Sequence, residues 1–324
     1  MQFACPQCRE PLYVQTKAYW CPVCVLTFPV LCGIPDFRLF ADPYIDIEAD
    51  RAKGLALEQA TAQMSFQDAV RHYYAITPED PPDLAEKWTA RALAEVQIAQ
   101  SMLTESGTGP VLDIGCSTGA VLIAAGGGVG VDIAFRWLVL GRLRLREAGL
   151  SGQLICANAE HLPFAANQRA RVTCFDSLEH FRDPAAALSE MRRVGSSLLV
   201  TSNNRWSPLP EPHVHLWGVG WLPRKLQAKY VAWRRGDLHP YRLRLHSAAE
   251  GAALARNAGW TEASVQASPI YAPQLGRSSQ LGLALYRAIR RWPGMALLTP
   301  RWMVKSLADR NQVAGRPEGR RLID

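Results

Sequence analysis

The chain has 324 residues, of which 48% are hydrophobic and 20% charged, and this composition is that of a globular protein rather than a disordered one. The length accommodates one large domain and a small one, and no apolar run is long enough to predict a membrane-spanning helix. The net charge of +7 leaves RNA, an anionic lipid surface and a phosphorylated metabolite open as partners, beside a surface that is merely solvated.

The beginning of the chain predicts a metal-binding module. Two C-P-x-C pairs, separated by twelve residues, contribute four cysteines: Cys5, Cys8, Cys21 and Cys24. Two such pairs complete the tetrahedral four-sulfur shell that zinc prefers, and four thiolates leave the metal no open position. We therefore expect a structural zinc and a zinc ribbon over residues 1–40. Paired C-x-x-C motifs without a secretory pattern also lead us to expect a cytoplasmic protein.

Helical periodicity follows from about residue 47 to 103, interrupted by the breaker T-P-E-D-P-P at 77–82. This pattern predicts a helical linker or cap over residues 41–109.

From residue 110 short apolar runs alternate with helical patterns. The expected strands are 111–114, 130–133, 153–157, 171–175 and 197–201, and the expected helices are 119–125, 136–147 and 185–194. Strands that alternate with helices at this spacing are typical of a parallel sheet covered on both faces. The predicted fold class is α/β, a Rossmann-like, doubly wound and mostly parallel sheet.

Residues 205–246 are rich in Trp, His, Pro and Arg, which is too aromatic for a linker. We expect a lid insertion that covers the carboxyl edge of the sheet, where ligands bind in open α/β folds. A helix at 247–258 and a strand pair near 260–265 then complete a domain that spans 110–270. Residues 271–324 are left as a basic and aromatic C-terminal extension, which packs on the core or contacts a membrane surface peripherally.

The segment V-L-D-I-G-C-S-T-G indicates a cofactor pocket. It places Asp113 at the end of an apolar strand, with Gly115 and Gly119 ahead of a helix, where glycine lets a ligand approach the backbone closely. A dinucleotide site carries G-x-G-x-x-G and binds a pyrophosphate there. Here the spacing is G-x-x-x-G, and the Asp113 carboxylate repels phosphate but attracts the cationic groups of S-adenosylmethionine (SAM). The segment therefore favours SAM over NAD.

This segment resembles the first motif of class I SAM-dependent methyltransferases, and the resemblance extends from about 111 to 201. Asp132, which ends G-V-G-V-D, matches the acid that bonds both ribose hydroxyls in this family. Asn158, Ala159 and Glu160 lead into L-P-F and match a D-A-E-x-L-P-F segment beside the adenine. The departure is Asn158 in place of the usual aspartate, and its amide oxygen still accepts a hydrogen bond from the adenine amino group.

The run S-L-E-H, from Ser177 to His180, matches a segment that lines the pocket near the transferred methyl group. Together with A-E-x-L-P-F it resembles the quinone-pathway methyltransferases of the type 11 family. The resemblance implies a seven-stranded sheet and a set of cofactor-binding residues: Asp113, Gly115, Cys116, Gly119, Asp132, Ile133, Asn158, Ala159, Glu160 and Ser177.

Methyl transfer requires alignment of the acceptor and, where the acceptor must lose a proton, a base. The candidates for this base are His180, His213, His215 and Glu211. His180 ranks first because S-L-E-H follows the fourth strand, although a purely structural histidine is the alternative there. His213 and His215 alternate with apolar residues, so we expect both on one face, where they bind substrate or pack in the lid, with a metal-binding pair as a third alternative.

Three functions stay open. The first is transfer of a methyl group to oxygen or carbon of a small-molecule or lipid-linked metabolite, with the aromatic lid around the acceptor. The second is methylation of an rRNA or tRNA base, because a four-cysteine ribbon ahead of a SAM domain resembles the rRNA guanine methyltransferases. The third is a SAM-binding protein without catalysis. The ribbon's G-I-P-D-F at 33–37 resembles the small zinc-ribbon partners that activate methyltransferases, so we favour a buttressing ribbon and a small-molecule acceptor.

Overall fold

The structure is a computed structural model that describes residues 1–77, 82–103, 109–236, 241–268 and 299–307, with a few single positions between 284 and 295. Its elements in chain order are β1 (Tyr13–Gln15), β2 (Ala18–Cys21), β3 (Leu26–Leu31), β4 (Ile34–Pro35), α1 (Ile47–Thr61), α2 (Phe66–Ala75), α3 (Pro82–Leu103), β5 (Val111–Ile114), α4 (Ala120–Ala125), β6 (Val129–Asp132), α5 (Phe135–Glu147), β7 (Gln153–Cys156), β8 (Ala170–Phe175), the 3₁₀ turn η1 (Leu178–His180), α6 (Pro184–Val194), β9 (Gly195–Asn203), the 3₁₀ turn η2 (Val219–Trp221), α7 (Arg224–Arg235), α8 (Ala248–Asn257), β10 (Ser264–Ala267) and β11 (Arg301–Leu307).

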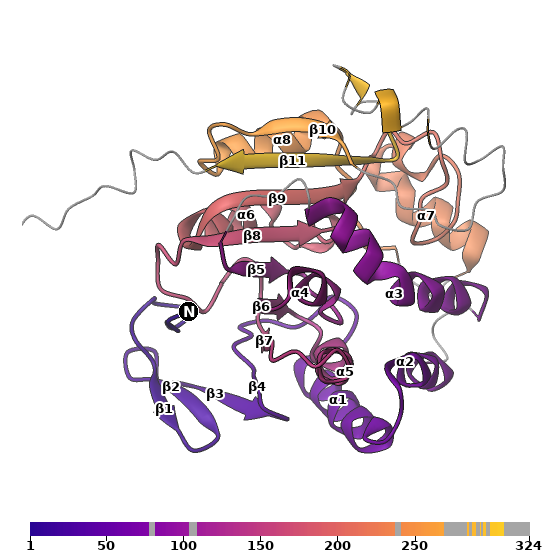
Figure 1. Ribbon diagram of the computed structural model, residues 1–324. Helices are drawn as coiled ribbons and strands as arrows, with labels where there is room; N and C mark the ends of the chain where they lie inside the picture. Colours follow the sequence, from indigo (N-terminus) through magenta and orange to yellow (C-terminus); the bar gives the residue numbers. More distant parts are fainter. Residues whose placement is uncertain are drawn as a thin grey trace, which may run out of the picture.

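Seven strands form the main sheet, in the order β10-β11-β9-β8-β5-β6-β7. The five strands from β7 to β9 pair in parallel, whereas β11 runs antiparallel to β9 and to β10. Figure 1 shows α3, α4 and α5 on one side of the sheet and α6 with α8 on the other. Each side has its own apolar core. The predicted Rossmann-like, doubly wound, mostly parallel seven-stranded sheet is confirmed.

The strand order places a crevice at the carboxyl end of β5. The chain runs outward from β5 to β6 and β7, and then returns to β8 on the other side of β5. Ligands of open α/β sheets bind where the order reverses in this way, because the loops leave neighbouring strands in opposite directions. β5 is buried along its whole length and is a firm support for the loop that follows it.

Capped N-termini and close packing stabilise α1 and α2, which precede the main domain. Asp46 accepts a hydrogen bond from the backbone N–H of Ala49 at the start of α1, and Ser65 caps α2 in the same way. α1 lies against α5 at Gly54, where an added Cβ would meet the ring of Phe135 at 2.4 Å. A glycine there allows the two helices to approach closely.

The cysteine-rich module packs on the free edge of the main sheet. Its four strands form an antiparallel sheet, and the exit from β4 continues along β7, where the Phe37 N–H donates to the Cys156 carbonyl at 2.7 Å. The ring of Phe3 stacks on Phe164 with centroids 5.9 Å apart. Figure 1 shows this module beside β6 and β7. The module therefore covers an edge that would otherwise expose unpaired backbone groups.

The far edge of the sheet differs from our expectation. We predicted a strand pair near 260–265, but β10 pairs with β11, which begins at Arg301 in the segment that we assigned to the C-terminal extension. The main sheet thus continues past the boundary that we placed at 270. Trp302 of β11 is fully buried against Gly251 of α8, where no side chain would fit. Local periodicity cannot reveal a pairing between strands so far apart in the chain.

The described parts of the insertion, 205–236 and 241–246, fold as loops around α7, with a small apolar core of their own centred on Val214, Val231 and Tyr241. None of the described helices is long and apolar enough to cross a membrane. Most of the extension at 271–324, including its last residues from 308, lies outside the described residues, so the expected peripheral membrane contact of that segment stays a prediction.

Candidate functional site

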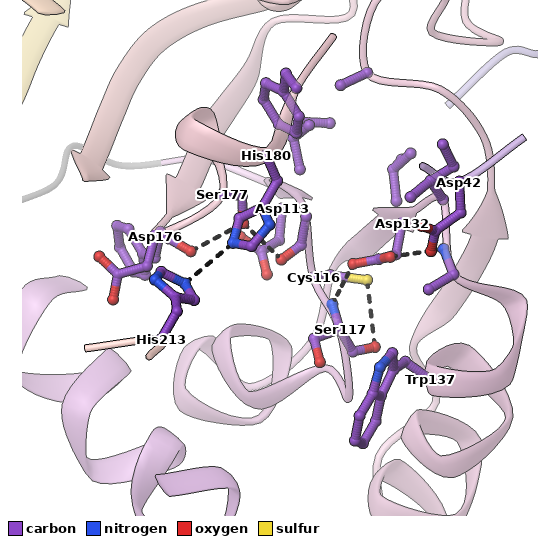
Figure 2. Close-up of a pocket in the computed structure, with 18 of the residues that line it drawn as sticks. Asp42, Asp113, Cys116, Ser117, Asp132, Trp137, Asp176, Ser177, His180 and His213 are labelled. Carbon is purple, nitrogen blue, oxygen red and sulfur yellow. Dashed lines mark hydrogen bonds between the residues drawn. The ribbon is translucent and has the colours of Figure 1, made fainter. Parts of the chain in front are cut away.

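A cavity of about 1030 Å³ opens at the carboxyl edge of the sheet (Figure 2). Its wall includes eight of the ten predicted cofactor-binding residues: Asp113, Gly115, Cys116, Asp132, Ile133, Ala159, Glu160 and Ser177. It also includes the three candidate histidines: His180, His213 and His215. Residues from the sheet and from the insertion therefore meet in one cavity, as the sequence patterns predict.

The loop between β5 and α4 is shaped for close approach. Gly115 has a φ of 75°, and a Cβ added there would lie 2.2 Å from the Ser177 hydroxyl oxygen, so no other residue fits. The N–H groups of Gly115 and Cys116 both donate to the Val131 carbonyl, which holds the loop against β6. The loop thus exposes bare backbone to the cavity at the end of the central strand, and we call this stretch of backbone the ledge.

Two carboxyl groups, that of the buried Asp113 and that of the half-buried Asp132, flank this ledge (Figure 2). Burial, reinforced by the charges of Asp132 and Glu95, raises the pKa of Asp113 to about 7, even though the Thr173 hydroxyl donates to it at 2.7 Å. Burial also raises the pKa of Asp132 to about 6, despite hydrogen bonds from backbone N–H groups on either side. A cation that enters the cavity favours the ionised form of both groups, so the pair is suited to a positively charged ligand.

Each oxygen of Asp132 accepts one backbone hydrogen bond. The Ser117 N–H donates to one oxygen and the Ala134 N–H to the other, both at 2.8 Å. These bonds fix the orientation of the carboxylate, and each oxygen keeps a second lone pair for a ligand. Two hydroxyl groups on adjacent carbons, as in a ribose, match this acceptor pair.

Two of the predicted cofactor residues lie elsewhere. Gly119 ends the loop with a φ of 75° but packs beside Leu145 rather than on the cavity wall. Asn158 is fully buried and faces the chain that leaves the ribbon. Its amide oxygen accepts from the Leu39 N–H at 2.8 Å, and its amide nitrogen donates to the Phe40 carbonyl at 3.1 Å. The expected bond from Asn158 to adenine is therefore wrong for this structure, because both ends of the amide are in use.

The turn η1 and the insertion together contribute a chain of titratable groups to the opposite wall. The Nε2 atoms of His180 and His213 lie 3.2 Å apart (Figure 2). Nδ1 of His213 lies 2.6 Å from a carboxylate oxygen of Glu211. The other Glu211 oxygen accepts the N–H groups of His213 and Val214. One proton is thus shared between the two imidazole rings, and Glu211 fixes which nitrogen of His213 faces His180.

The two histidines differ in basicity. Burial opposes the cationic form of His213, but the hydrogen bond and charge of Glu211 outweigh it, so the pKa of His213 is raised. The surrounding protein and the neighbouring His213 hold the pKa of His180 well below its usual range. A proton taken up by the pair therefore resides on His213, with His180 as the neutral acceptor of its hydrogen bond. His215 lines the cavity outside this pair.

The sequence patterns do not predict two further parts of the cavity wall. The first is the segment from Phe40 to Tyr44, which leaves the ribbon and crosses the cavity. The second is Asp176, after β8, which binds Arg91 of α3 at 2.8 Å and Arg301 of β11 at 2.7 Å. Neither segment carries a motif, and only the fold brings α3 and β11 to the same carboxylate.

The four cysteines of the ribbon also converge. Their sulfur atoms lie within 4.8 Å of one another, with 4.0 Å between Cys5 and Cys24 and 3.5 Å between Cys8 and Cys21. Zinc–sulfur bonds of about 2.3 Å in a tetrahedron separate the sulfurs by about 3.8 Å. The cluster therefore fits a zinc ion in geometry and in chemistry.

Comparison with known proteins matches a family to the part of the chain that forms the cofactor side of the cavity. Residues 112–197 match the family described as methyltransferase domain, and this interval contains the β5 loop, Asp132 and Ser177. The chain carries a class I SAM-dependent methyltransferase domain. The domain supplies the ledge and the carboxyl groups of Asp113 and Asp132, whereas the ribbon and the insertion lie outside the matched interval.

The methyltransferase domain is similar to relatives over part of their length. It is 38% identical over 105 residues to a ubiquinone biosynthesis O-methyltransferase from Aromatoleum aromaticum, covering 29% of this chain and 44% of the relative. It is 31% identical over 137 residues to the ubiquinone/menaquinone biosynthesis C-methyltransferase UbiE from Cupriavidus pinatubonensis, covering 38% and 56%. The chain spans about half the length of these curated relatives.

Solved structures are similar at lower identity. A SAM-dependent methyltransferase from Thermotoga maritima has a TM-score of 0.45 and 17% identity, with 75% of this chain and 97% of that chain covered. A complex between the Trm112 methyltransferase activator and a methyltransferase from Haloferax volcanii has a TM-score of 0.43 and 16% identity, with 67% and 92% covered.

Proposed function

We propose that this protein transfers a methyl group from SAM to oxygen or carbon of a small-molecule or lipid-linked metabolite. The observation that carries this proposal is a single cavity in which the carboxyl groups of Asp113 and Asp132 face a histidine pair with a carboxylate behind it. The names of the relatives add support, since one is a ubiquinone biosynthesis O-methyltransferase and another a quinone-pathway C-methyltransferase.

On the cofactor side, Asp132 is suited to the ribose hydroxyl groups and Asp113 to the cationic end of SAM. The N–H groups that hold Asp132 leave one lone pair free on each of its oxygens. The Gly115 ledge lets the ligand approach the end of β5 without steric conflict. SAM, when bound, supplies a methyl group that its sulfonium already activates. The protein therefore contributes mainly alignment of the acceptor.

On the acceptor side, His213 is the base that we assign. Glu211 holds the Nδ1 hydrogen of His213, so Nε2 is the basic nitrogen toward the cavity. An acceptor hydroxyl or acidic carbon that replaces His180 as the partner of Nε2 loses its proton there, and Glu211 stabilises the cation that forms. His180 keeps the ring of His213 in place until the acceptor arrives. His180, our first candidate from sequence, becomes a positioning residue in this proposal.

We also propose that the ribbon binds a structural zinc ion. The ribbon lies against β7 and against the loop at 158–164, so the metal stabilises the sheet edge next to the cofactor side of the cavity. This packing also supports the buttressing role over RNA recognition. Methylation of an RNA base and SAM binding without catalysis are kept as outcomes of the test below.

The test is incubation of the full chain with methyl-labelled SAM and fractionated cell extract. We expect label in the lipid or small-molecule fraction, and we expect His213→Gln to lower it by about a hundredfold or more. Label confined to RNA would replace the proposal with the RNA alternative. Binding of SAM without label in any fraction would support a non-catalytic protein.

A further inference from the structure

The insertion over the cavity exposes an unusual amount of aromatic surface. Four tryptophans in this insertion have exposed fractions from 38% to 76%: Trp206, Trp217, Trp221 and Trp233. Leu209 and Leu226 are exposed among them, at 50% and 47%. Large apolar side chains gathered on one exposed segment mark an interaction surface rather than a solvated one.

These side chains are held outward by the fold. On α7, Leu226, Tyr230 and Trp233 are spaced to share one stripe, while Val231 is buried on the opposite side. The Tyr230 hydroxyl donates to the Trp217 carbonyl at 3.0 Å, which joins the stripe to the loop before η2. We call the four tryptophans and two leucines, with α7, the lid patch.

The same segment is strongly basic. Six cationic side chains lie between residues 205 and 236, and two of them, Arg205 and Arg224, pair with Glu250 of α8. The other four are Lys225, Lys229, Arg234 and Arg235. The carboxylate in this interval belongs to Glu211, which is buried and bound to His213. The lid patch therefore combines exposed tryptophan and leucine with the positive charge of the cations that Glu250 does not pair.

We propose that the lid patch docks the protein on an anionic lipid bilayer. Tryptophan prefers the headgroup region, leucine enters the acyl boundary, and lysine and arginine are attracted to anionic headgroups. Single-stranded RNA would use the cations and the aromatic rings by stacking, but it offers no partner for the exposed leucines. The bilayer accounts for all three kinds of side chain.

The lid patch belongs to the same insertion as part of the cavity wall, so docking also determines where the cavity lies relative to the membrane. Pro212, His213 and His215 of the same insertion line the cavity, and α7 lies beyond the carboxyl ends of β8 and β9 (Figure 1). Docking therefore brings the acceptor side of the cavity to the membrane surface, where a lipid-linked acceptor resides. The docking itself goes beyond the proposed function, because it requires neither SAM nor turnover.

The experiment is co-sedimentation of the full chain with vesicles of phosphatidylcholine, with and without phosphatidylglycerol. We expect binding that needs the anionic lipid and weakens with salt. Lys225→Gln with Lys229→Gln should weaken it by roughly thirtyfold, as expected for two cations at an anionic surface. Trp217→Ala with Trp233→Ala should weaken binding at high salt as well, because the apolar contribution is not screened.

Two matched controls test the location. Tyr13→Ala removes an exposed aromatic ring from the ribbon, and Trp292→Ala removes an exposed ring from the C-terminal extension; both should bind vesicles like the unaltered protein. Circular dichroism and SAM affinity establish that each variant is folded. Equal binding to neutral vesicles, loss of binding in Trp292→Ala alone, or displacement from vesicles by single-stranded RNA would each overturn the proposal.

Discussion

At the scale of residues, the two carboxyl groups under the β5 loop define what the cavity accepts. Loss of contact with water raises the pKa of Asp113 to about 7 and that of Asp132 to about 6, and the charge of Asp132 adds to the rise at Asp113. A cationic ligand restores their charge and releases protons, whereas a phosphate would meet repulsion from both. The preference for SAM over a dinucleotide, inferred from the spacing of the glycines, thus has a physical basis in this pair.

The histidine pair leads to a prediction on pH. Since His213 must be neutral to accept a proton, the rate should fall as pH drops through the pKa of His213, which Glu211 holds above its ordinary value of 6.5. Glu211→Gln removes the stabilising charge but keeps an oxygen for the backbone N–H groups. We expect the acidic limb of the kcat profile to move to lower pH, with a reduced kcat on the plateau.

The control for this prediction is His72→Gln, which removes an imidazole from α2 and should leave the profile unchanged. His213→Gln should abolish the acidic limb. A limb that stays in place in Glu211→Gln would mean that another group limits the rate at low pH, and it would contradict the assignment of His213 as the base.

Asn158 is a residue whose place in the chain the sequence motif predicts but whose side-chain contacts it does not. The motif located the residue correctly in the chain, beside Ala159 and Glu160, but not the direction of its side chain. An aspartate could accept the Leu39 N–H but could not donate to the Phe40 carbonyl, so the amide suits the chain that leaves the ribbon. Asn158 stands in place of the family's aspartate at a position where its side chain binds the segment that leaves the ribbon. No local sequence pattern reveals that contact.

At the scale of elements, the ribbon and the segment after it form one support for the cavity. Arg38 is buried and binds Asp36 at 2.7 Å and Asp50 of α1 at 2.6 Å. Asp50 also accepts the N–H of Phe135 at the start of α5, directly after the loop that contains Asp132. The ribbon exit, α1 and α5 are therefore joined by buried charges next to the cofactor side.

The zinc prediction belongs to this scale. We expect about one zinc ion per chain, lost in Cys5→Ser with Cys8→Ser, because a module of this size has too little apolar core to fold without the metal. Elemental analysis measures the metal, and hydrogen exchange should become fast over residues 1–40 in the variant. Cys32→Ser, a cysteine outside the cluster, is the control and should retain the zinc. Wild-type protein that binds no zinc even after reconstitution would contradict this prediction.

Sequence patterns located the parallel strands well because each is a short apolar run bounded by a turn. The expected strand at 111–114 coincides with β5, and the expected strand at 171–175 differs from β8 by one residue. β11 was missed because its partners β9 and β10 lie far away in sequence, and its mixture of apolar and charged residues suits an extension as well as a strand. Long-range pairing, rather than strand propensity, decides its place.

At the scale of the whole molecule, four regions meet at the carboxyl edge of one sheet. The ribbon exit supplies Phe40 to Tyr44, α3 supplies Arg91, the insertion supplies His213 and β11 supplies Arg301. The sequence alone predicted the cofactor side, because it is continuous from β5 to η1. It predicted a lid with histidines over this edge, but it did not predict that Arg91, Arg301 and the ribbon exit join the wall, since these lie in segments without motifs.

The central claim is that this cavity binds SAM with the ribose on Asp132. The most direct measurement is calorimetric titration of SAM into the wild type, Asp132→Ala and Asp132→Asn, with Asp68→Ala of α2 as the control. The account predicts that the wild type and Asp68→Ala bind alike. It predicts affinity at least tenfold lower in both Asp132 variants, the loss expected for hydrogen bonds to a charged group. Equal affinity in all four proteins would contradict it.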